Sequence, residues 1–217
     1  MGARKQPVPP APRRRRDPET ARAEILDAAE RVLAASRPDA VGLKEVAKAA
    51  GVSHALVSHY FGTYVEVVDE VLARRVRKLR AMALGRLADP GALMDMEGLL
   101  DTLFGALEDP LYVRLSLWAM AAERPSGYVS FPFRDRGMRI FAEAATARVQ
   151  QARPELDAEA LRQRVELALV IANGAAYGYT IGKESWLAAL AREPSLDFDR
   201  ALREALGGML RRYVLGE

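Results

Sequence analysis

The stretch KEVAKAAGVSHALVSHYFG, residues 44–62, decides the fold of the N-terminal part of the chain. Its pattern is typical of two short helices joined by a tight turn, a helix-turn-helix. The first helix needs a small residue where the two helices cross, which Ala47 supplies, and the turn needs a residue that tolerates positive φ, which Gly51 supplies. The apolar residues expected to hold the two helices together are Val46, Ala50, Val52, Val57 and Tyr60.

The outward positions of the second helix carry small or polar side chains that suit the base edges of a DNA major groove. They are His54, Ala55, Ser58 and His59. The two histidines, the only ones in the chain, make a poor zinc site because zinc takes three or four ligands and no acidic residue lies between them. No serine, histidine and carboxylate set has a spacing suited to acyl transfer, so we expect no enzyme and no catalytic residue. The alternative interpretation of His54 and His59 is a solvent-exposed pair without function.

Helical periodicity continues on both sides of this stretch and predicts an all-α fold with about nine helices. A helix is expected to begin at Asp17-Pro18 and end near Ser36, and a long one to run from about Tyr64 into the 80s. No alternating, β-branched strand pattern is present. The further helices expected are 43–50, 53–60, 95–108, 110–123, 127–152, 157–186 and 198–215, with prolines at several of the junctions.

The charge of the chain is concentrated at its N-terminus. The net charge is +3, and residues 1–16 contain six Lys or Arg residues and no Asp or Glu. Prolines and the run Arg13–Arg16 predict a flexible basic arm over residues 1–17, which indicates a nucleic-acid partner or, alternatively, a solubilising tail. The chain has no cysteine, no secretory signal and no run apolar enough to span a membrane, so we expect a cytoplasmic protein without a thiolate site.

Residues 25 to about 72 resemble the N-terminal domain of the TetR family of transcriptional regulators. The segments that carry the resemblance are ILDAAERVL, LKEVAKAAGVS and HYF, and LVSHYFG is most similar to the choline-responsive Bet-type repressors. The resemblance implies a three-helix DNA-binding domain at 18–63 and a larger ligand-binding and dimerisation domain at 64–217, connected by the helix 64–84. The DNA-binding residues implied are Arg13, Arg14, Arg15, Arg16, Lys44, Ser53, His54, Ala55, Ser58, His59, Tyr60 and Tyr64.

Three positions depart from the usual pattern of that family. Gly42 stands where a threonine commonly caps a helix and touches phosphate, and Tyr64 stands where a lysine is usual. Arg37 replaces a usual glycine before the second helix. Two phosphate contacts are therefore weakened, and the Arg13–Arg16 arm is expected to compensate by reaching the minor groove.

The second domain carries most of the aromatic residues, and the resemblance implies a small-molecule effector bound inside it. We expect the following residues to line that site: Phe104, Tyr112, Trp118, Met120, Tyr128, Phe133, Phe141 and Tyr177. A quaternary ammonium effector would suit an aromatic cage through cation–π contacts of about 0.5–2 kcal/mol each. The alternative for each aromatic is a place in the core. No metal or other cofactor is expected.

Two helices near the C-terminus are expected to form a homodimer interface. Small residues gather in ANGAAYGYTIG, residues 172–182, and permit close helix approach. A mid-helix glycine costs about 1 kcal/mol, so a packing contact should offset it. The expected interface residues are Gly174, Ala175, Gly178, Leu202, Leu206, Met209 and Leu210. The alternative is tight packing within one subunit.

Together these features predict a ligand-responsive one-component transcriptional regulator, a repressor that binds a pseudo-palindromic operator as a dimer and is released by a small molecule. The alternative function is a structural, sequence-tolerant DNA-binding protein without small-molecule input. The two differ in whether the second domain has a filled core.

Overall fold

The computed structural model describes residues 17–89, 96–121 and 136–217. Within these ranges the chain forms nine α-helices and a short 3-10 turn, with no strand, so the predicted all-α fold is confirmed. The chain divides into two compact units, one ending at Tyr64 and one running from Val65 to Glu217. None of the helices in the described ranges is long and apolar enough to cross a membrane.

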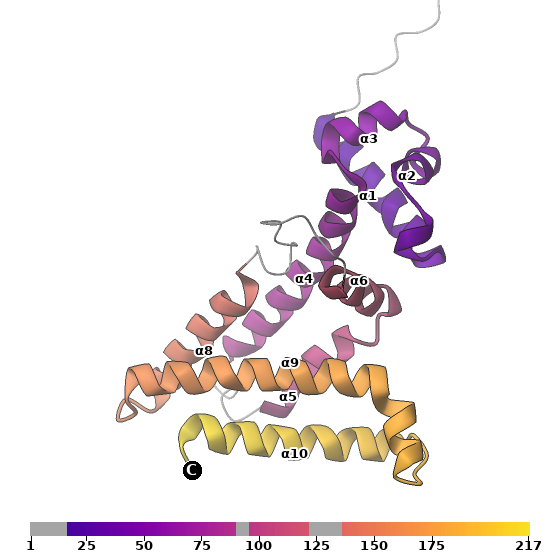
Figure 1. Cartoon of the computed structure of the whole chain (residues 1–217). Coiled ribbons are helices and arrows are strands. Elements are labelled where there is room, and N and C mark those ends of the chain that lie inside the picture. Colours follow the sequence, from indigo (N-terminus) through magenta and orange to yellow (C-terminus); the bar gives the residue numbers. More distant parts are fainter. Residues whose placement is uncertain (1–16, 90–95, 122–135) are drawn as a thin grey trace, which may run out of the picture. The chain divides into compact units, whose positions relative to one another are not determined.

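The first unit contains α1 (Pro18–Ala35), α2 (Leu43–Ala50) and α3 (His54–Phe61), with the 3-10 turn Pro38–Ala40 between α1 and α2 (Figure 1). The predicted start of α1 is confirmed, because Asp17 caps it and accepts a hydrogen bond from the Thr20 N–H at 3.1 Å. The buried core of this unit comes from all three helices and includes Ala21, Ile25, Leu26, Ala28, Ala29, Leu33, Val46, Ala47, Val57 and Phe61.

The turn between α2 and α3 has the chemistry expected from the sequence. Gly51 has φ 65° and ψ 33°, the left-handed conformation that closes a helix at little cost only in glycine. The Val52 N–H then donates to the Ala47 carbonyl at 3.0 Å. Ser53 begins α3, and its Oγ accepts a hydrogen bond from the Leu56 N–H at 3.2 Å. These local bonds fix the direction in which α3 leaves the turn.

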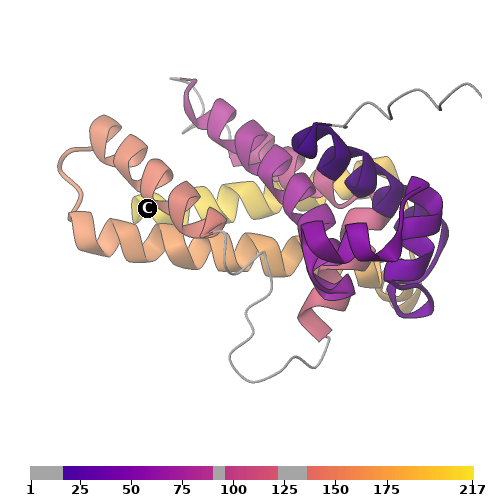
Figure 2. The same ribbon diagram turned by 90° about the horizontal axis from the view of Figure 1, so that it is seen from above.

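The second unit is a helical domain built from α4 (Tyr64–Leu87), whose first residue belongs to the first unit, and five further helices. They are α5 (Met96–Ala106), α6 (Pro110–Ala121), α8 (Gly137–Ala152), α9 (Ala158–Ala189) and α10 (Leu196–Leu215). The long helices α9 and α10 run antiparallel to each other, and α8 lies alongside α9 (Figures 1 and 2). The helix expected at 127–152 is found from Gly137 onward, and residues 127–135 lie outside the described ranges.

Candidate nucleic-acid interface, cavity and helix surface

The outer face of α3 carries the residues that were expected to contact DNA. His54, Ala55 and His59 are exposed, whereas Ser58 is half-buried. On the opposite face Val57 is fully buried. The helix is therefore anchored by its apolar face and presents two imidazoles and one small side chain to solvent.

Two aromatic residues close α3. The ring of Tyr60, half-buried, meets the ring of His59 edge-on, with centroids 5.4 Å apart. Phe61 is buried, and the Arg22 guanidinium of α1 lies 4.9 Å from its ring centroid. This cation–π contact ties the end of α3 to α1 and limits the movement of the exposed face.

The helix α2 begins without a side-chain cap. Gly42 occupies the N-cap, and its N–H donates to the Glu45 Oε2 at 2.8 Å, which is half of a capping box. Lys44, in the first turn of α2, is exposed. The missing hydroxyl at position 42 was expected from the sequence. The Glu45 carboxylate satisfies the N–H of Gly42 itself and does not replace the bond that a hydroxyl would accept from the first turn of α2.

Tyr64 has an internal partner that sequence patterns did not indicate. Its hydroxyl donates to the Pro38 carbonyl at 2.8 Å, across the first unit. Burial and then the nearby carboxylates of Asp39 and Glu45 raise the pKa of Tyr64 well above its ordinary value, so the hydroxyl keeps its proton. The phosphate contact expected of Tyr64 stays a prediction, and it competes with this hydrogen bond. The basic arm Arg13–Arg16 lies outside the described residues.

The second unit encloses a cavity of about 560 Å³ whose lining comes from α4, α5, α6, α8, α9 and α10. Four of the residues expected to contact an effector line it: Tyr112, Met120, Phe141 and Tyr177. Most of the other lining residues are aliphatic, which sequence reasoning from aromatic residues did not identify. They include Leu79, Leu100, Leu103, Val149, Val165, Leu169, Leu210 and Val214.

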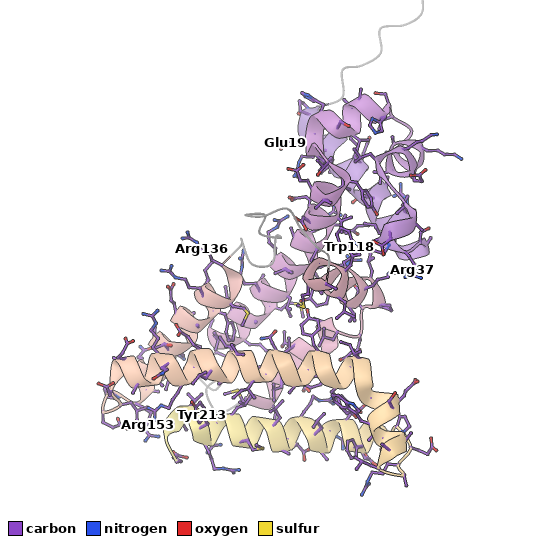
Figure 3. All side chains as sticks on the ribbon, viewed as in Figure 1. Glu19, Arg37, Trp118, Arg136, Arg153 and Tyr213 are labelled. Atoms are coloured by element: carbon purple, nitrogen blue, oxygen red, sulfur yellow. The ribbon has the colours of Figure 1, made fainter. Side chains whose placement is uncertain are left out.

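The remaining residues expected in the effector site lie elsewhere. Phe104 is buried against the ring of Tyr179, whose centroid is 6.3 Å away, and does not line the cavity. Trp118 lies on α6 and is also absent from the lining (Figure 3). Tyr128 and Phe133 lie outside the described residues. Phe104 thus occupies the core beside Tyr179, which was the alternative expected for each aromatic residue.

The cavity has a neutral polar end and a charged end. At the neutral end the Tyr177 hydroxyl donates to the Tyr112 oxygen at 3.1 Å. Burial above all, together with Tyr177, raises the pKa of Tyr112 well above its usual value. At the charged end Arg153 Nη1 lies 3.3 Å from Glu217 Oε1, and Figure 3 shows Arg153 close to the C-terminal end of α10. Arg211 also lines the cavity.

A junction at Asp109 links the cavity to α4. One carboxylate oxygen of Asp109 accepts hydrogen bonds from the N–H groups of Leu111 (2.9 Å) and Tyr112 (3.3 Å), and so caps α6. The other oxygen lies 3.1 Å from Nε of Arg75 on α4. Because Tyr112 lines the cavity, a displacement of the N-terminus of α6 would act directly on this ion pair.

The outward faces of α9 and α10 carry apolar stripes at helical spacing. On α9 the stripe is exposed at Leu167, Val170, Ile171 and Ile181, with Gly174 between them; on α10 it contains Leu202, Leu206, Met209 and Tyr213. Met209 is 61% exposed and Val170 is 60% exposed. Leu210, which was also expected in the interface, is 4% exposed and lines the cavity. Leu210 therefore does not belong to this exposed surface.

Two glycines of α9 have a neighbour within their own helix. A Cβ on Gly182 would lie 2.6 Å from Cε2 of Trp186, and one on Gly178 would lie 3.2 Å from Cη2 of the same indole. A Cβ on Gly174 would meet nothing within 4 Å. Gly178 and Gly182 thus make room for the Trp186 ring, and only Gly174 leaves the helix surface open for close approach.

A polar cluster joins α9 to α10. Asp199 accepts a hydrogen bond from the Tyr179 hydroxyl at 2.6 Å and one from Lys183 Nζ at 2.7 Å. Burial opposes ionisation of Asp199, but these two donors outweigh it, so its pKa is lowered. Burial and the hydrogen bond to Asp199 raise the pKa of Tyr179 to about 12. The cluster fixes the packing of the two helices.

This geometry defines a class of protein: a helix-turn-helix domain followed by a larger all-helical domain that encloses a cavity. The family described as bacterial regulatory proteins, tetR family, matches residues 25–71. The N-terminal part of the chain thus matches the helix-turn-helix DNA-binding domain of that family.

Two sequence relatives match about a third of the chain. Two uncharacterised HTH-type transcriptional regulators from strains of Mycobacterium tuberculosis are 37% identical over 71 residues, which are 33% of this chain and 35% of theirs. The match therefore spans about a third of the length of these relatives. The likeness to choline-responsive repressors stays a prediction.

Solved structures extend the similarity of fold to both domains. A TetR-family transcriptional regulator from Streptomyces coelicolor has a TM-score of 0.58 and 19% identity, with 91% of this chain and 89% of that chain covered. NalD, the secondary repressor of the MexAB-OprM multidrug efflux pump in Pseudomonas aeruginosa, has a TM-score of 0.60 and 20% identity, with 91% and 97% covered. At these identities the similarity shows a common fold.

Proposed function

We propose that this protein is a homodimeric, ligand-responsive transcriptional regulator, a repressor, which binds a pseudo-palindromic operator through α3 and is released by a small molecule. The observation that carries the proposal is the exposed face of α3, held on a capped and buried helix pair. Among the described residues, this face combines the shape of a major-groove helix with side chains that can donate and accept hydrogen bonds.

The base-facing residues in this proposal are His54, Ala55, Ser58 and His59. The imidazoles can donate or accept, and Ala55 leaves room for a thymine methyl group. Ser53, Lys44 and Tyr60 would contact phosphates beside them. Because Gly42 offers no hydroxyl and Tyr64 is bonded to Pro38, the phosphate contacts of the domain are few, and the basic arm at 13–16 would add the missing ones.

Dimerisation through α9 and α10 would give the operator its two-fold symmetry. The exposed stripes on these helices are apolar over several turns, which suits a four-helix interface between two copies. Residues for this contact are Gly174, Ala175, Leu202, Leu206 and Met209 from the expected set, with Val170, Ile171 and Tyr213 added from the structure. Gly178 of the expected set lies against the Trp186 ring of its own helix. Each dimer would present two copies of α3 to successive turns of the duplex.

Release of DNA would follow from ligand binding in the cavity. A ligand beside Tyr112 would shift the N-terminus of α6, and with it Asp109 and its partner Arg75 on α4. Because α4 continues directly from the DNA-binding domain at Tyr64, the ligand need only favour a dimer geometry whose α3 spacing mismatches the operator.

The alternative, a sequence-tolerant DNA-binding protein without small-molecule input, predicts a filled core in the second domain. The cavity of about 560 Å³ favours the ligand-responsive protein, since interiors without a ligand function contain few voids larger than a water molecule. The size also falls in the range of small-molecule sites.

The test is fluorescence anisotropy with labelled DNA from upstream of the protein's own coding region and with a scrambled duplex, at two salt concentrations. His54→Ala and His59→Ala are compared with Arg31→Ala, which removes a charge from an exposed position of α1. Each histidine variant should lose about 1–3 kcal/mol on the specific duplex only, and the control should match the wild type. Equal binding of both duplexes, steeply dependent on salt and indifferent to the histidines, would reject the proposed function.

A further inference from the structure

The shape of the cavity in the second domain restricts the molecules that can fill it. Lining residues follow α9 from Val165 to Tyr177, which at 1.5 Å per residue is a length of about 18 Å. The same calculation on α8, from Gly137 to Arg153, gives about 24 Å. A volume of about 560 Å³ that follows α8 and α9 over such a length is an elongated channel, which α4, α5, α6 and α10 also line. A long, thin molecule fits it better than a compact ring system.

The wall of this channel is aliphatic along its middle. The side chains there offer no hydrogen-bonding groups to a ligand, and they come from α8, α9 and α10: Ala145, Val149, Val165, Ala168, Leu169, Leu210 and Val214. Two polar side chains of the lining each use one donor within the protein, because Asn173 Nδ2 donates to the Leu169 carbonyl and the Thr102 hydroxyl donates to the Gly98 carbonyl. The described middle of the channel therefore favours a hydrocarbon segment of a ligand.

Charge is uneven along the channel. In the part of the chain that the structure describes, the charged lining residues are three arginines, Arg80, Arg153 and Arg211, and one acid, Glu217. At one end Arg153 bonds to two carboxylates, Glu217 of the lining and Glu155, which does not line the channel. The side chains of Arg153 and Glu217 are 39% and 46% exposed, so a charged group placed there keeps part of its hydration. At the Tyr112–Tyr177 end the polar groups are neutral hydroxyls that bond each other.

We propose that the effector is an amphiphile with a single long apolar chain and an anionic head group, of the class of long-chain carboxylates. The head group lies at Arg153 and Arg211, and the chain follows α8 and α9 toward Tyr112 and Tyr177. The inference rests on the proposed function only where it names this ligand the effector, because binding of the amphiphile in the cavity does not require DNA. A terminal group at the Tyr112–Tyr177 pair then acts on the Asp109 junction described above.

A quaternary ammonium effector fits these observations less well. The only carboxylate among the described lining residues is Glu217, which is already paired with Arg153. Among the described residues, three aromatic rings line the cavity, Tyr112, Phe141 and Tyr177. The pair Tyr112–Tyr177 uses its hydroxyls on each other, and no carboxylate lies at that end of the described lining. A cation there would lose its hydration without a counter-charge.

The test is isothermal titration calorimetry of the full chain with three probes of equal chain length: decanoate, decanol and decyltrimethylammonium, each below its micellar concentration. Decanoate should bind most tightly. Arg153→Gln combined with Arg211→Gln should weaken decanoate about tenfold and leave decanol unchanged, since exposed charge pairs contribute at most about fivefold each. The matched control, Arg212→Gln, removes the neighbouring exposed arginine that does not line the cavity, and should have no effect.

Chain length gives a second, independent measurement. From octanoate to dodecanoate, affinity should rise about fourfold per methylene group while the chain still lies inside the channel. The proposal would be overturned if the ammonium probe bound more tightly than decanoate, or if affinity did not depend on chain length. It would also be overturned if the double arginine variant lost the same affinity for all three probes. Operator binding is measured separately. A protein that binds DNA but no decanoate loses only this inference, whereas one that binds decanoate but no DNA loses the proposed function.

Discussion

Ser53 offers a way to separate the folding role of the N-terminus of α3 from its role on DNA. Its Oγ accepts the Leu56 N–H at 3.2 Å at an exposed position, so Ser53→Ala removes an N-cap and should cost about 1 kcal/mol of stability. Ser53→Asp keeps an acceptor at the cap and adds a negative charge at the positive end of the helix, which should stabilise the domain by about 0.3–1 kcal/mol. The aspartate variant should therefore be the most stable of the three proteins and the alanine variant the least stable.

The order of DNA affinity should be different, because the same carboxylate would face phosphates. One phosphate about 6 Å from the new charge contributes about 0.7 kcal/mol of repulsion in water, and two contribute about a tenfold loss of affinity. That loss should shrink as salt is raised, because screening shortens the range of the repulsion. Ser53→Ala should lose only about fivefold, the value of one neutral phosphate contact.

Urea unfolding followed by circular dichroism gives the stability order, and anisotropy with operator DNA at low and high salt gives the affinity order. If the Ser53→Asp variant is more stable and still binds DNA as tightly as the wild type, the N-terminus of α3 lies away from the phosphates. The docking of α3 in the groove would then be wrong, whatever the histidine variants showed.

Three further outcomes are expected. Met209→Asp puts a charge into the exposed stripe of α10 and should convert the dimer to a folded monomer, measured by analytical ultracentrifugation; an unchanged dimer would exclude this surface. Asp199→Asn should make the free energy of unfolding, measured in urea titrations, fall less steeply at acid pH. The pKa of Asp199 is lowered in the folded protein, so the stabilisation by Tyr179 and Lys183 is present above about pH 4 and is lost as the pH falls through that lowered pKa. Equal acid dependence in both proteins would contradict this. Gly42→Ser should raise stability by a few tenths of a kcal/mol and tighten DNA binding, since the residue has φ −150° and a Cβ there would lie 3.5 Å from its nearest neighbour; weaker binding would mean that α2 does not start at a phosphate.

The DNA-binding domain was predictable nearly to the residue because its decisive interactions are local. The left-handed Gly51, the Ser53 cap and the Asp17 cap each involve partners within a few positions along the chain. Turn and cap chemistry depends on such short spacings, so the sequence specifies it without knowledge of tertiary packing. The buried positions Val46 and Val57 followed from helical periodicity for the same reason.

The contacts that escaped prediction join distant parts of the chain. The hydrogen bond from Tyr64 to Pro38 spans 26 positions and the one from Tyr177 to Tyr112 spans 65 positions. Nothing in the local pattern marks such pairs. The cavity is a further case, because it results from the way six helices fail to fill the space between them, and its aliphatic lining looks like ordinary core in the sequence.

Trp186 represents an intermediate case, in which the signal was local but was interpreted differently. Glycines four and eight positions before an exposed tryptophan on one helix face leave room for the indole to lie along the helix, as it does over Gly182 and Gly178. The cost of mid-helix glycine can therefore be offset inside one chain as well as between two. The part of α9 that still needs a partner is the open surface at Gly174 and the exposed apolar residues beside it.

The modest size of the DNA-facing set has a consequence for regulation in the proposed mechanism. One α3 with few phosphate partners would bind a half-site weakly, and operator affinity would come from two half-sites engaged at once by a dimer. The second contact then occurs at a high effective concentration, and it is lost entirely when the spacing is wrong. An effector would not need to unfold or block α3. A shift at the Asp109 junction need only move α4 slightly in each subunit. Most of the affinity for the operator would then be lost, because each half-site binds weakly when the two are not engaged at once.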